Sequence, residues 1–134
     1  MERRTYTAAD ADRTLPFVSR VVEDIVAEHA RWRALVAALE MANATRVADV
    51  SDPRAESLER DVLAAAARLD AYAAELAPLG VVVQSHELGL VDFPATVDGR
   101  PAFLCWRLGE PAVRFWHDRG AGLIGRRPLY SRAA

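Results

Sequence analysis

Two regular apolar stripes constrain the fold of this chain more than any other feature of its sequence. In the first stripe, side chains recur at alternating intervals of three and four residues: Leu15, Val18, Val22, Ile25, His29, Trp32, Val36 and Leu39. The second stripe has the same alternation: Leu58, Val62, Ala65, Leu69, Tyr72, Leu76 and Leu79. Such spacing is typical of the packed seam of an α-helix. Two such helices with a short polar connection predict an antiparallel helical hairpin, with coiled-coil-like packing, over about residues 8–79.

The expected starts of the helices carry residues that favour helix initiation. Thr7 and Asp10 have the spacing of a capping box, which predicts a short helical turn, and Pro16 suits the first turn of a longer helix. Asp52, or the serine before it, is expected to cap the second helix, with Pro53 in its first turn.

After Gly80 the apolar pattern changes to a period of two, which predicts β-strands. The expected strands are VVVQS (81–85), GLVDFPATV (89–97), PAFLCWRL (101–108) and AVRFWH (112–117). Asp98-Gly99 favours a tight hairpin, and Gly109-Glu110 is the next expected turn. We therefore predict an α+β fold, in which a long antiparallel helical hairpin packs on a small C-terminal antiparallel β-sheet. Residues 1–134 are expected to form a single domain, with the sheet and a Gly/Arg-rich tail in residues 80–134.

Two-residue loops at both turns predict a strand register. Asp92 then lies opposite Cys105, and Cys105 lies opposite Arg114. The face expected to pack on the helices carries Val91, Phe93, Leu104, Trp106, Val113 and Phe115. Trp32, Leu69, Phe93 and Phe115 are expected to share one core. The other face carries Asp92, Cys105 and Arg114 in one row, flanked by Pro94, Phe103 and Trp116. Because aromatic side chains on that face call for cover, we expect a homodimer.

Composition excludes several classes of protein. The 17 basic residues are all arginine, so mechanisms that use a lysine Schiff base are excluded. The single cysteine, Cys105, rules out an internal disulfide and a Cys-rich zinc site. The sequence contains no signal-peptide pattern and no apolar run long enough to cross a membrane, which predicts a cytoplasmic protein. The net charge of −2 disfavours nucleic acid as a partner, although residues 100–134 hold seven arginines against two acidic residues.

The hexapeptide GAGLIG, residues 120–125, matches the dinucleotide-binding pattern G-x-G-x-x-G. That pattern binds pyrophosphate only where a strand precedes it, a helix follows it, and an acidic residue lies about 20 positions further on. Only nine residues follow Gly125, and Pro128 is among them. We therefore expect no NAD, NADP or FAD site, and the residues leave metal binding open.

Four segments together resemble a bacterial family known as domain of unknown function 2203: GLVDFPA (89–95), LCWRLGEP (104–111), FWH (115–117) and GRRPL (125–129). The resemblance covers nearly the whole chain and is densest in the last third. Members of that family typically have Asp-Ala-Gly-Phe where this chain has Gly-Ala-Gly-Leu at 120–123, so the first glycine of the apparent fingerprint departs from the family pattern. The resemblance implies no mechanism, because the family has no assigned activity.

Several polar residues near the ends of the predicted strands are candidates for a site. His117 and Glu110 are candidates for acid–base catalysis, and Arg126 is suited to hold an anion. If the strand is extended, Glu110 lies some 23 Å from His117. His117 with Arg126 is therefore the favoured pair, and Glu110 is a turn residue or a partner from another chain.

Three further residues belong to this candidate set. Asp92 and Arg114 are candidates for ligand binding or for a cross-strand ion pair. Cys105 is either a nucleophile or a small core residue. The seam residue His29 is more often a packed core histidine than a ligand.

These residues support two main hypotheses and leave open whether the protein is an enzyme. The favoured one is a ligand-binding or enzymatic site for a small anionic molecule, with or without a metal, at the C-terminal sheet and the glycine loop. The alternative is a non-catalytic interaction or adaptor protein that self-associates through its hairpin or its outer sheet face. Binding of nucleotide or RNA is a third possibility, which the net charge disfavours.

Overall fold

A helical hairpin and a five-stranded antiparallel sheet make up the computed structural model, which describes residues 4–120 and 125–129. The hairpin consists of α1 (Ala8–Ala44) and α2 (Pro53–Leu76), followed by the short 3-10 helix η1 (Ala77–Leu79). The strands pair in chain order: β1 (Val82–Ser85), β2 (Leu90–Val97), β3 (Arg100–Arg107), β4 (Phe115–Asp118) and β5 (Arg127–Pro128). The predicted α+β fold is thus confirmed. Residues 121–124 of the GAGLIG segment lie outside the described residues.

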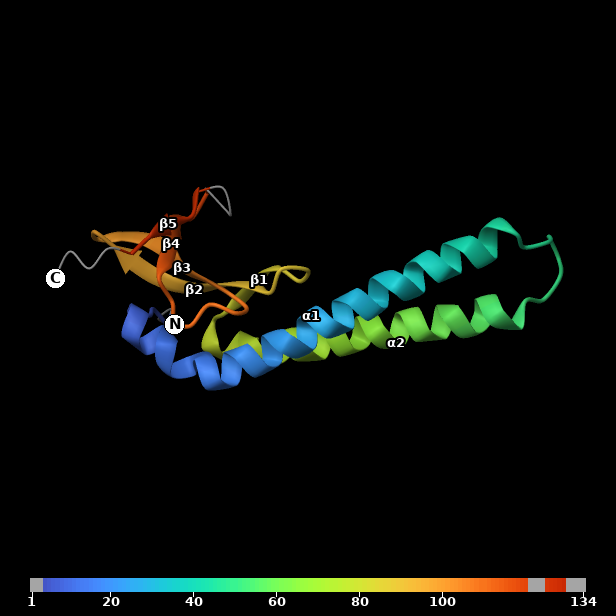
Figure 1. Ribbon diagram of the computed structural model, residues 1–134, viewed down its shortest axis with the longest axis horizontal. Helices are drawn as coiled ribbons and strands as arrows, with labels where there is room; N and C mark the ends of the chain where they lie inside the picture. Colours follow the sequence, from blue (N-terminus) through green and yellow to red (C-terminus); the bar gives the residue numbers. More distant parts are fainter. Residues whose placement is uncertain (1–3, 121–124, 130–134) are drawn as a thin grey trace.

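The sheet covers only one end of the hairpin. It lies where α1 begins and α2 ends, and the rest of the hairpin projects well beyond it (Figure 1). Asp52 caps α2 as expected, because its side chain accepts hydrogen bonds from the backbone N–H groups of Arg54 and Ala55. Among the described residues, neither helix contains an apolar stretch that would suit a membrane crossing.

The first helix begins earlier than the sequence suggested. The Thr7 hydroxyl accepts from the Asp10 backbone N–H at 3.0 Å, and the Asp10 carboxylate accepts from the Thr7 N–H at 3.1 Å. This capping box starts α1 itself, so the prediction of a separate short turn before Pro16 was wrong. Pro16 lies inside one continuous helix, since Ala11 and Val18 on either side of it are fully buried and their packing offsets one lost hydrogen bond.

One apolar core joins the hairpin to the inner face of the sheet. Its buried members are Tyr6, Ala11, Val18, Val21, Val22, Ile25, Leu76, Val81, Val91, Phe93, Ala95, Leu104, Trp106 and Val113. The Tyr6 ring packs edge-on against Phe93 at 5.2 Å, and its hydroxyl donates to the carbonyl of Leu79 at 2.6 Å. Leu69 and Phe93 share this core as predicted, whereas Trp32 lies beside His29 on the hairpin, outside the cluster.

The register of β2 against β3 agrees with the prediction, and that of β3 against β4 does not. Asp92 lies opposite Cys105 as expected. On β4, however, Phe115 and not Arg114 lies opposite Cys105. A shift of one residue exchanges the two faces of a strand. Phe115 therefore lies on the outer face, and Trp116 packs against the core. The predictions for Phe115, Trp116 and Arg114 were wrong on this point.

The connection from β3 to β4 explains this shift. A turn forms as expected, with the Glu110 N–H donating to the Arg107 carbonyl at 3.0 Å, but Pro111 follows and has no N–H for a ladder hydrogen bond. The Val113 N–H then donates to the Asp12 carboxylate on α1 at 2.7 Å, so it is not available to the sheet. Strand β4 consequently starts at Phe115, three residues later than predicted, and Arg114 is left exposed outside it.

Candidate functional site

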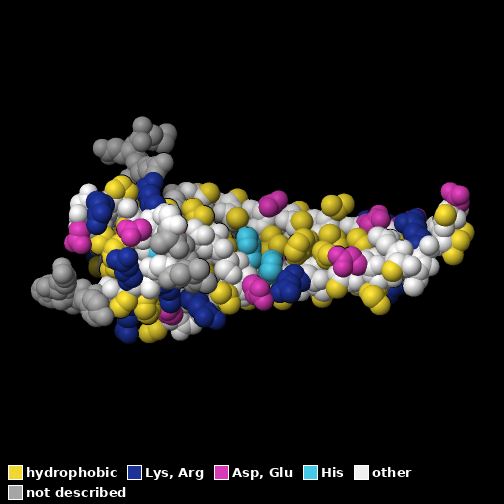
Figure 2. All heavy atoms as spheres, turned by 90° about the horizontal axis from the view of Figure 1, so that it is seen from above, with side chains coloured by type: hydrophobic (Ala, Val, Ile, Leu, Met, Phe, Trp, Pro, Cys, Tyr) yellow, Lys and Arg dark blue, Asp and Glu magenta, His cyan; other side chains and the backbone are white. Residues whose placement is uncertain are grey.

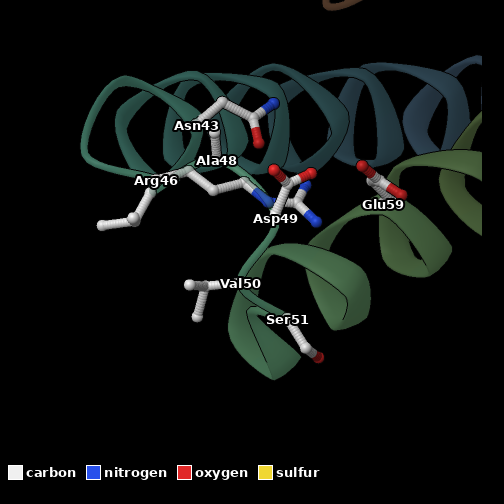
Figure 3. A pocket seen from close by; sticks show the side chains of 8 residues that line it. Asn43, Arg46, Ala48, Asp49, Val50, Ser51 and Glu59 are labelled. Atoms are coloured by element: carbon white, nitrogen blue, oxygen red, sulfur yellow. The ribbon is translucent and has the colours of Figure 1, made fainter.

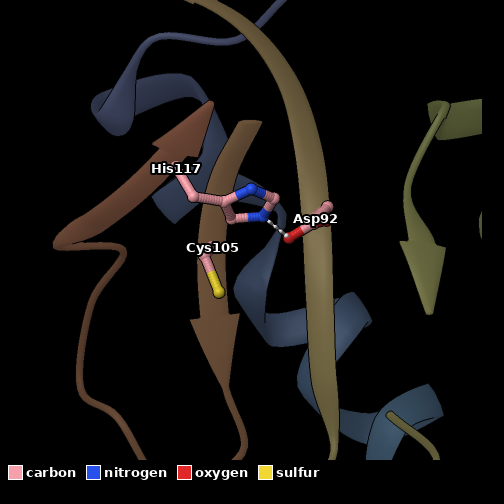
Figure 4. Close-up of side chains that lie close together, drawn as sticks. All are labelled: Asp92, Cys105 and His117. Atoms are coloured by element: carbon pink, nitrogen blue, oxygen red, sulfur yellow. Dashed lines mark hydrogen bonds and ion pairs between the residues drawn. The ribbon is translucent and has the colours of Figure 1, made fainter. Parts of the chain in front are cut away.

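Three side chains that can bind metals lie side by side on the outer face of the sheet: Asp92 on β2, Cys105 on β3 and His117 on β4 (Figure 4). Their ligand atoms all lie within 4.8 Å of one another. The register produces this grouping, because Asp92 pairs with Cys105 and His117 pairs with the residue two before Cys105. The residues are 0%, 0% and 2% exposed, so the cluster is a buried polar site in a small protein.

Both nitrogens of the His117 ring have oxygen partners. Nδ1 lies 2.8 Å from the backbone carbonyl of Asp118, and Nε2 lies 2.9 Å from Oδ1 of Asp92. A carbonyl can only accept, so Nδ1 carries a proton. A second proton must lie between Nε2 and Oδ1, since neither a bare imidazole nitrogen nor a carboxylate oxygen can donate. The pair therefore holds one proton that a cation could displace.

The second carboxylate oxygen of Asp92 is left without a partner. Oδ2 is fully buried and has no hydrogen-bond donor among the described residues. An unsatisfied buried polar group costs about 1–3 kcal/mol, and native proteins rarely keep one without a water, an ion or a function. This oxygen is the strongest sign that the cluster receives something from outside the chain.

Cys105 links the Asp92–His117 pair to a second charged pair. The Arg126 Nε–H donates to Sγ of Cys105 at 3.4 Å, and Nη2 of the same guanidinium forms an ion pair with Glu110. The guanidinium also stacks over the ring of Phe115 at 3.9 Å. Burial raises the pKa of the Cys105 thiol, and the Arg126 guanidinium offsets only part of this rise.

The structure brings most of the predicted site residues together, in pairs that differ from the predicted ones. His117 pairs with Asp92 and not with Arg126, and Arg126 pairs with Glu110. Glu110 comes near because the residues before β4 do not continue as an extended strand. The cross-strand ion pair that was one alternative for Asp92 and Arg114 does not form, since Arg114 lies outside the sheet.

Sequence reasoning missed the role of Cys105 as the contact between these two pairs. Pro111 is a local sign against a two-residue loop at 109–110, because it has no N–H for the ladder, but it does not indicate which residue of β4 lies opposite Cys105. His29 likewise has neighbours that the sequence did not indicate. Its ring stacks on that of His86, with centroids 5.6 Å apart, and lies tilted against that of Trp32, with centroids 5.8 Å apart.

Comparison with known proteins assigns a family. Residues 4–129 match the family model described as "Uncharacterized conserved protein (DUF2203)". The chain belongs to this family. No curated protein and no solved structure matches it. The family description names no activity, so the function of this DUF2203 member has to be argued from the buried cluster itself.

Proposed function

We propose that the protein binds a divalent transition-metal ion through Asp92, Cys105 and His117. The observation that carries the proposal is the buried, unpartnered Oδ2 of Asp92, which lies in a cluster with a thiol and an imidazole. Thiolate, imidazole and carboxylate are the donors of zinc sites, and the thiolate favours zinc over magnesium or calcium. A lone aspartate or cysteine would not support this, whereas three donors on three neighbouring strands do.

Groups behind the three donors support the same assignment. A histidine that binds a metal through one nitrogen usually donates its other N–H to a carbonyl or carboxylate. His117 has this arrangement, with Nδ1 directed at the Asp118 carbonyl and Nε2 towards the cluster. The Arg126 N–H directed at Sγ of Cys105 would stabilise a thiolate in the same way. Because the metal replaces protons at Sγ and Nε2, binding should release about two protons per ion.

The donor count favours a site that acts on a ligand. Four protein ligands usually make a closed structural zinc site, whereas three leave a coordination position for water or substrate. An oxygen of a small anionic molecule is suited to that position. Water bound to such an ion loses its proton near neutral pH, so the reaction class that fits best is hydrolysis. The proposed hydrolysis requires the bound metal, whereas metal binding does not require that the protein is an enzyme.

Titration of metal-free protein with Co²⁺ tests the proposal directly. Co²⁺ replaces zinc in such sites, and a thiolate ligand gives it an intense near-ultraviolet absorption band. We expect one equivalent of Co²⁺ to bind with this band, and Zn²⁺ to displace it. Cys105→Ser should abolish the band and Asp92→Asn should weaken binding at least tenfold. His29→Gln, which alters a half-buried histidine that stacks on His86 outside the cluster, is the matched control and should leave both unchanged.

Two outcomes would overturn the metal proposal. One is folded protein, shown by circular dichroism, that binds less than 0.1 equivalent of either ion at a concentration of about 100 μM. The other is binding that survives Cys105→Ser and Asp92→Asn unchanged, which would place the ion elsewhere. In either case the Asp92–His117 pair would only stabilise the sheet by joining β2 to β4.

Self-association through the hairpin is a second candidate function, because the projecting part of the hairpin exposes apolar side chains. Met41, Val47 and Val50 at its tip are 72%, 66% and 56% exposed, and Leu63 on α2 is 70% exposed. Figure 2 shows hydrophobic side chains along this projecting part, and Figure 3 shows the polar hollow at its tip. A two-helix ribbon can cover only one side of each helix, so a homodimer would bury more of this surface.

Light scattering on purified protein tests this second candidate. A mass near twice the chain mass of 14.7 kDa, lost in Leu63→Glu, would support a dimer formed through the hairpin. A monomer at about 100 μM would argue against it, since stable homodimers persist at that concentration.

A further inference from the structure

A second hollow opens on the outer face of the sheet, next to the buried cluster. Its volume is about 430 Å³, within the range of small-molecule sites. Its apolar wall is formed by Pro94 on β2, Phe103 on β3 and Val82 on β1. The Phe103 ring also packs against the ring of His117, with centroids 5.5 Å apart, so the hollow shares a wall with the cluster.

Gly80 contributes to the opening of this hollow. It ends η1 in a left-handed conformation with φ of 74°, and a Cβ atom there would lie 3.6 Å from the ring of Pro94. A side chain at this position would therefore extend over the apolar wall. The positive φ favours glycine at this position, and because glycine has no side chain the entrance stays uncovered.

Two arginines line the hollow, and neither forms an ion pair with any described residue. The Arg4 guanidinium stacks over the ring of Tyr6 at 5.1 Å, and that of Arg119 stacks over Phe103 at 5.5 Å. Stacking fixes the plane of a guanidinium and leaves its N–H groups directed outwards, where they suit a carboxylate or phosphate. By contrast, Arg126, which the sequence suggested for this role, is already neutralised by Glu110.

We propose that this hollow binds a small organic carboxylate whose apolar body packs on Phe103 and Pro94 and whose carboxylate lies between Arg4 and Arg119. The apolar wall selects a flat aromatic or aliphatic body, and the two arginines, which form no ion pair within residues 4–120 and 125–129, select a negative charge. The site needs no metal, because none of the residues that line it belongs to the Asp92, Cys105 and His117 cluster. It is therefore independent of the metal proposal.

Binding of benzoate to metal-free protein tests the site, followed by calorimetry or by amide shifts in NMR spectra. Benzamide is the neutral control of the same shape. We expect benzoate to bind at least tenfold more tightly than benzamide. The double variant Arg4→Gln with Arg119→Gln should lose this preference. Arg100→Gln, which removes an exposed arginine outside the hollow, should keep it.

The same titration in Cys105→Ser separates this proposal from the metal proposal. Benzoate binding that persists in metal-free Cys105→Ser supports an independent carboxylate site, even where Co²⁺ binding has failed. Equal affinity for benzoate and benzamide would overturn the carboxylate proposal. So would an absence of binding in folded protein, or a requirement for added metal, which would place the anion on the ion.

Discussion

Gly89 provides the sharpest test of how the sheet meets the hairpin. It lies in the turn between β1 and β2, with φ of 69°. A Cβ atom at this position would lie 2.8 Å from Cβ of Leu108, 3.0 Å from Cγ2 of Val26 and 3.1 Å from Cγ1 of Val22. Two of these neighbours belong to α1, so Gly89→Ala forces the turn away from the helix.

The loss of stability in Gly89→Ala has two parts. A left-handed conformation costs a residue with a Cβ atom about 1–2 kcal/mol relative to glycine. Inserting a methyl group into a packed contact costs about 1–3 kcal/mol more, so the free energy of unfolding should fall by about 2–5 kcal/mol. Gly99→Ala is the matched control, because its φ is 77° and no atom lies within 4 Å of the added Cβ. It should lose only the first part.

Urea denaturation followed by circular dichroism measures both variants under the same conditions. We expect Gly89→Ala to be less stable than Gly99→Ala by about 1–3 kcal/mol. In a chain of this size, each kcal/mol lowers the melting temperature by about 4 °C. Equal losses in the two variants, within about 0.5 kcal/mol, would refute the close approach of the turn to α1. The packing of the sheet on the hairpin would then need revision.

Three further predictions concern the core, the half-buried His29 and the glycine loop. Leu69→Ala should lower the free energy of unfolding by about 2–3 kcal/mol, because Leu69 is only partly buried against the core; an unchanged urea midpoint would contradict this. Burial, together with His86 and Arg33, lowers the pKa of His29 below 6.5, so the unfolded chain binds a proton at His29 more readily than the folded chain does. Stability should therefore fall as the pH drops below about 6.5, and His29→Gln should reduce that dependence in urea titrations at several pH values. Gly120→Asp should leave the melting temperature unchanged, because no atom of the described part of the chain lies within 4 Å of a Cβ placed there. Micromolar NAD binding that this substitution abolished would refute the expectation of no dinucleotide site.

The helical hairpin and the turn between β2 and β3 could be predicted because local signals determine them. The seams repeat without a break over each helix, and the caps at Thr7 and Asp52 depend on neighbouring residues. Asp98 and Gly99 both have positive φ, at 52° and 77°, as a two-residue hairpin turn requires. That turn fixed Asp92 opposite Cys105 correctly.

The start of β4 could not be predicted in the same way, because a distant residue determines it. The Val113 N–H bonds to Asp12, which lies 101 positions earlier in the chain. Local turn rules cannot anticipate a side chain of α1 that takes a backbone donor from the sheet. The additional strand β5 has a similar origin, since its two residues carry no pattern of their own and pair only because β4 offers a free edge.

The cluster of Asp92, Cys105 and His117 depends on the register of β4 against β3. The alternation of side chains along β4 indicates that register from the sequence. Placing Phe115 inward also places His117 inward, because alternate residues of a strand share a face. A histidine in the apolar core would have had no partner, at a cost of about 1–3 kcal/mol, whereas Trp116 would have been left outside. The observed register reverses both: Trp116 packs on the core and His117 meets Asp92. Weighing the face of His117 before that of Phe115 would have brought Asp92, Cys105 and His117 together from the sequence.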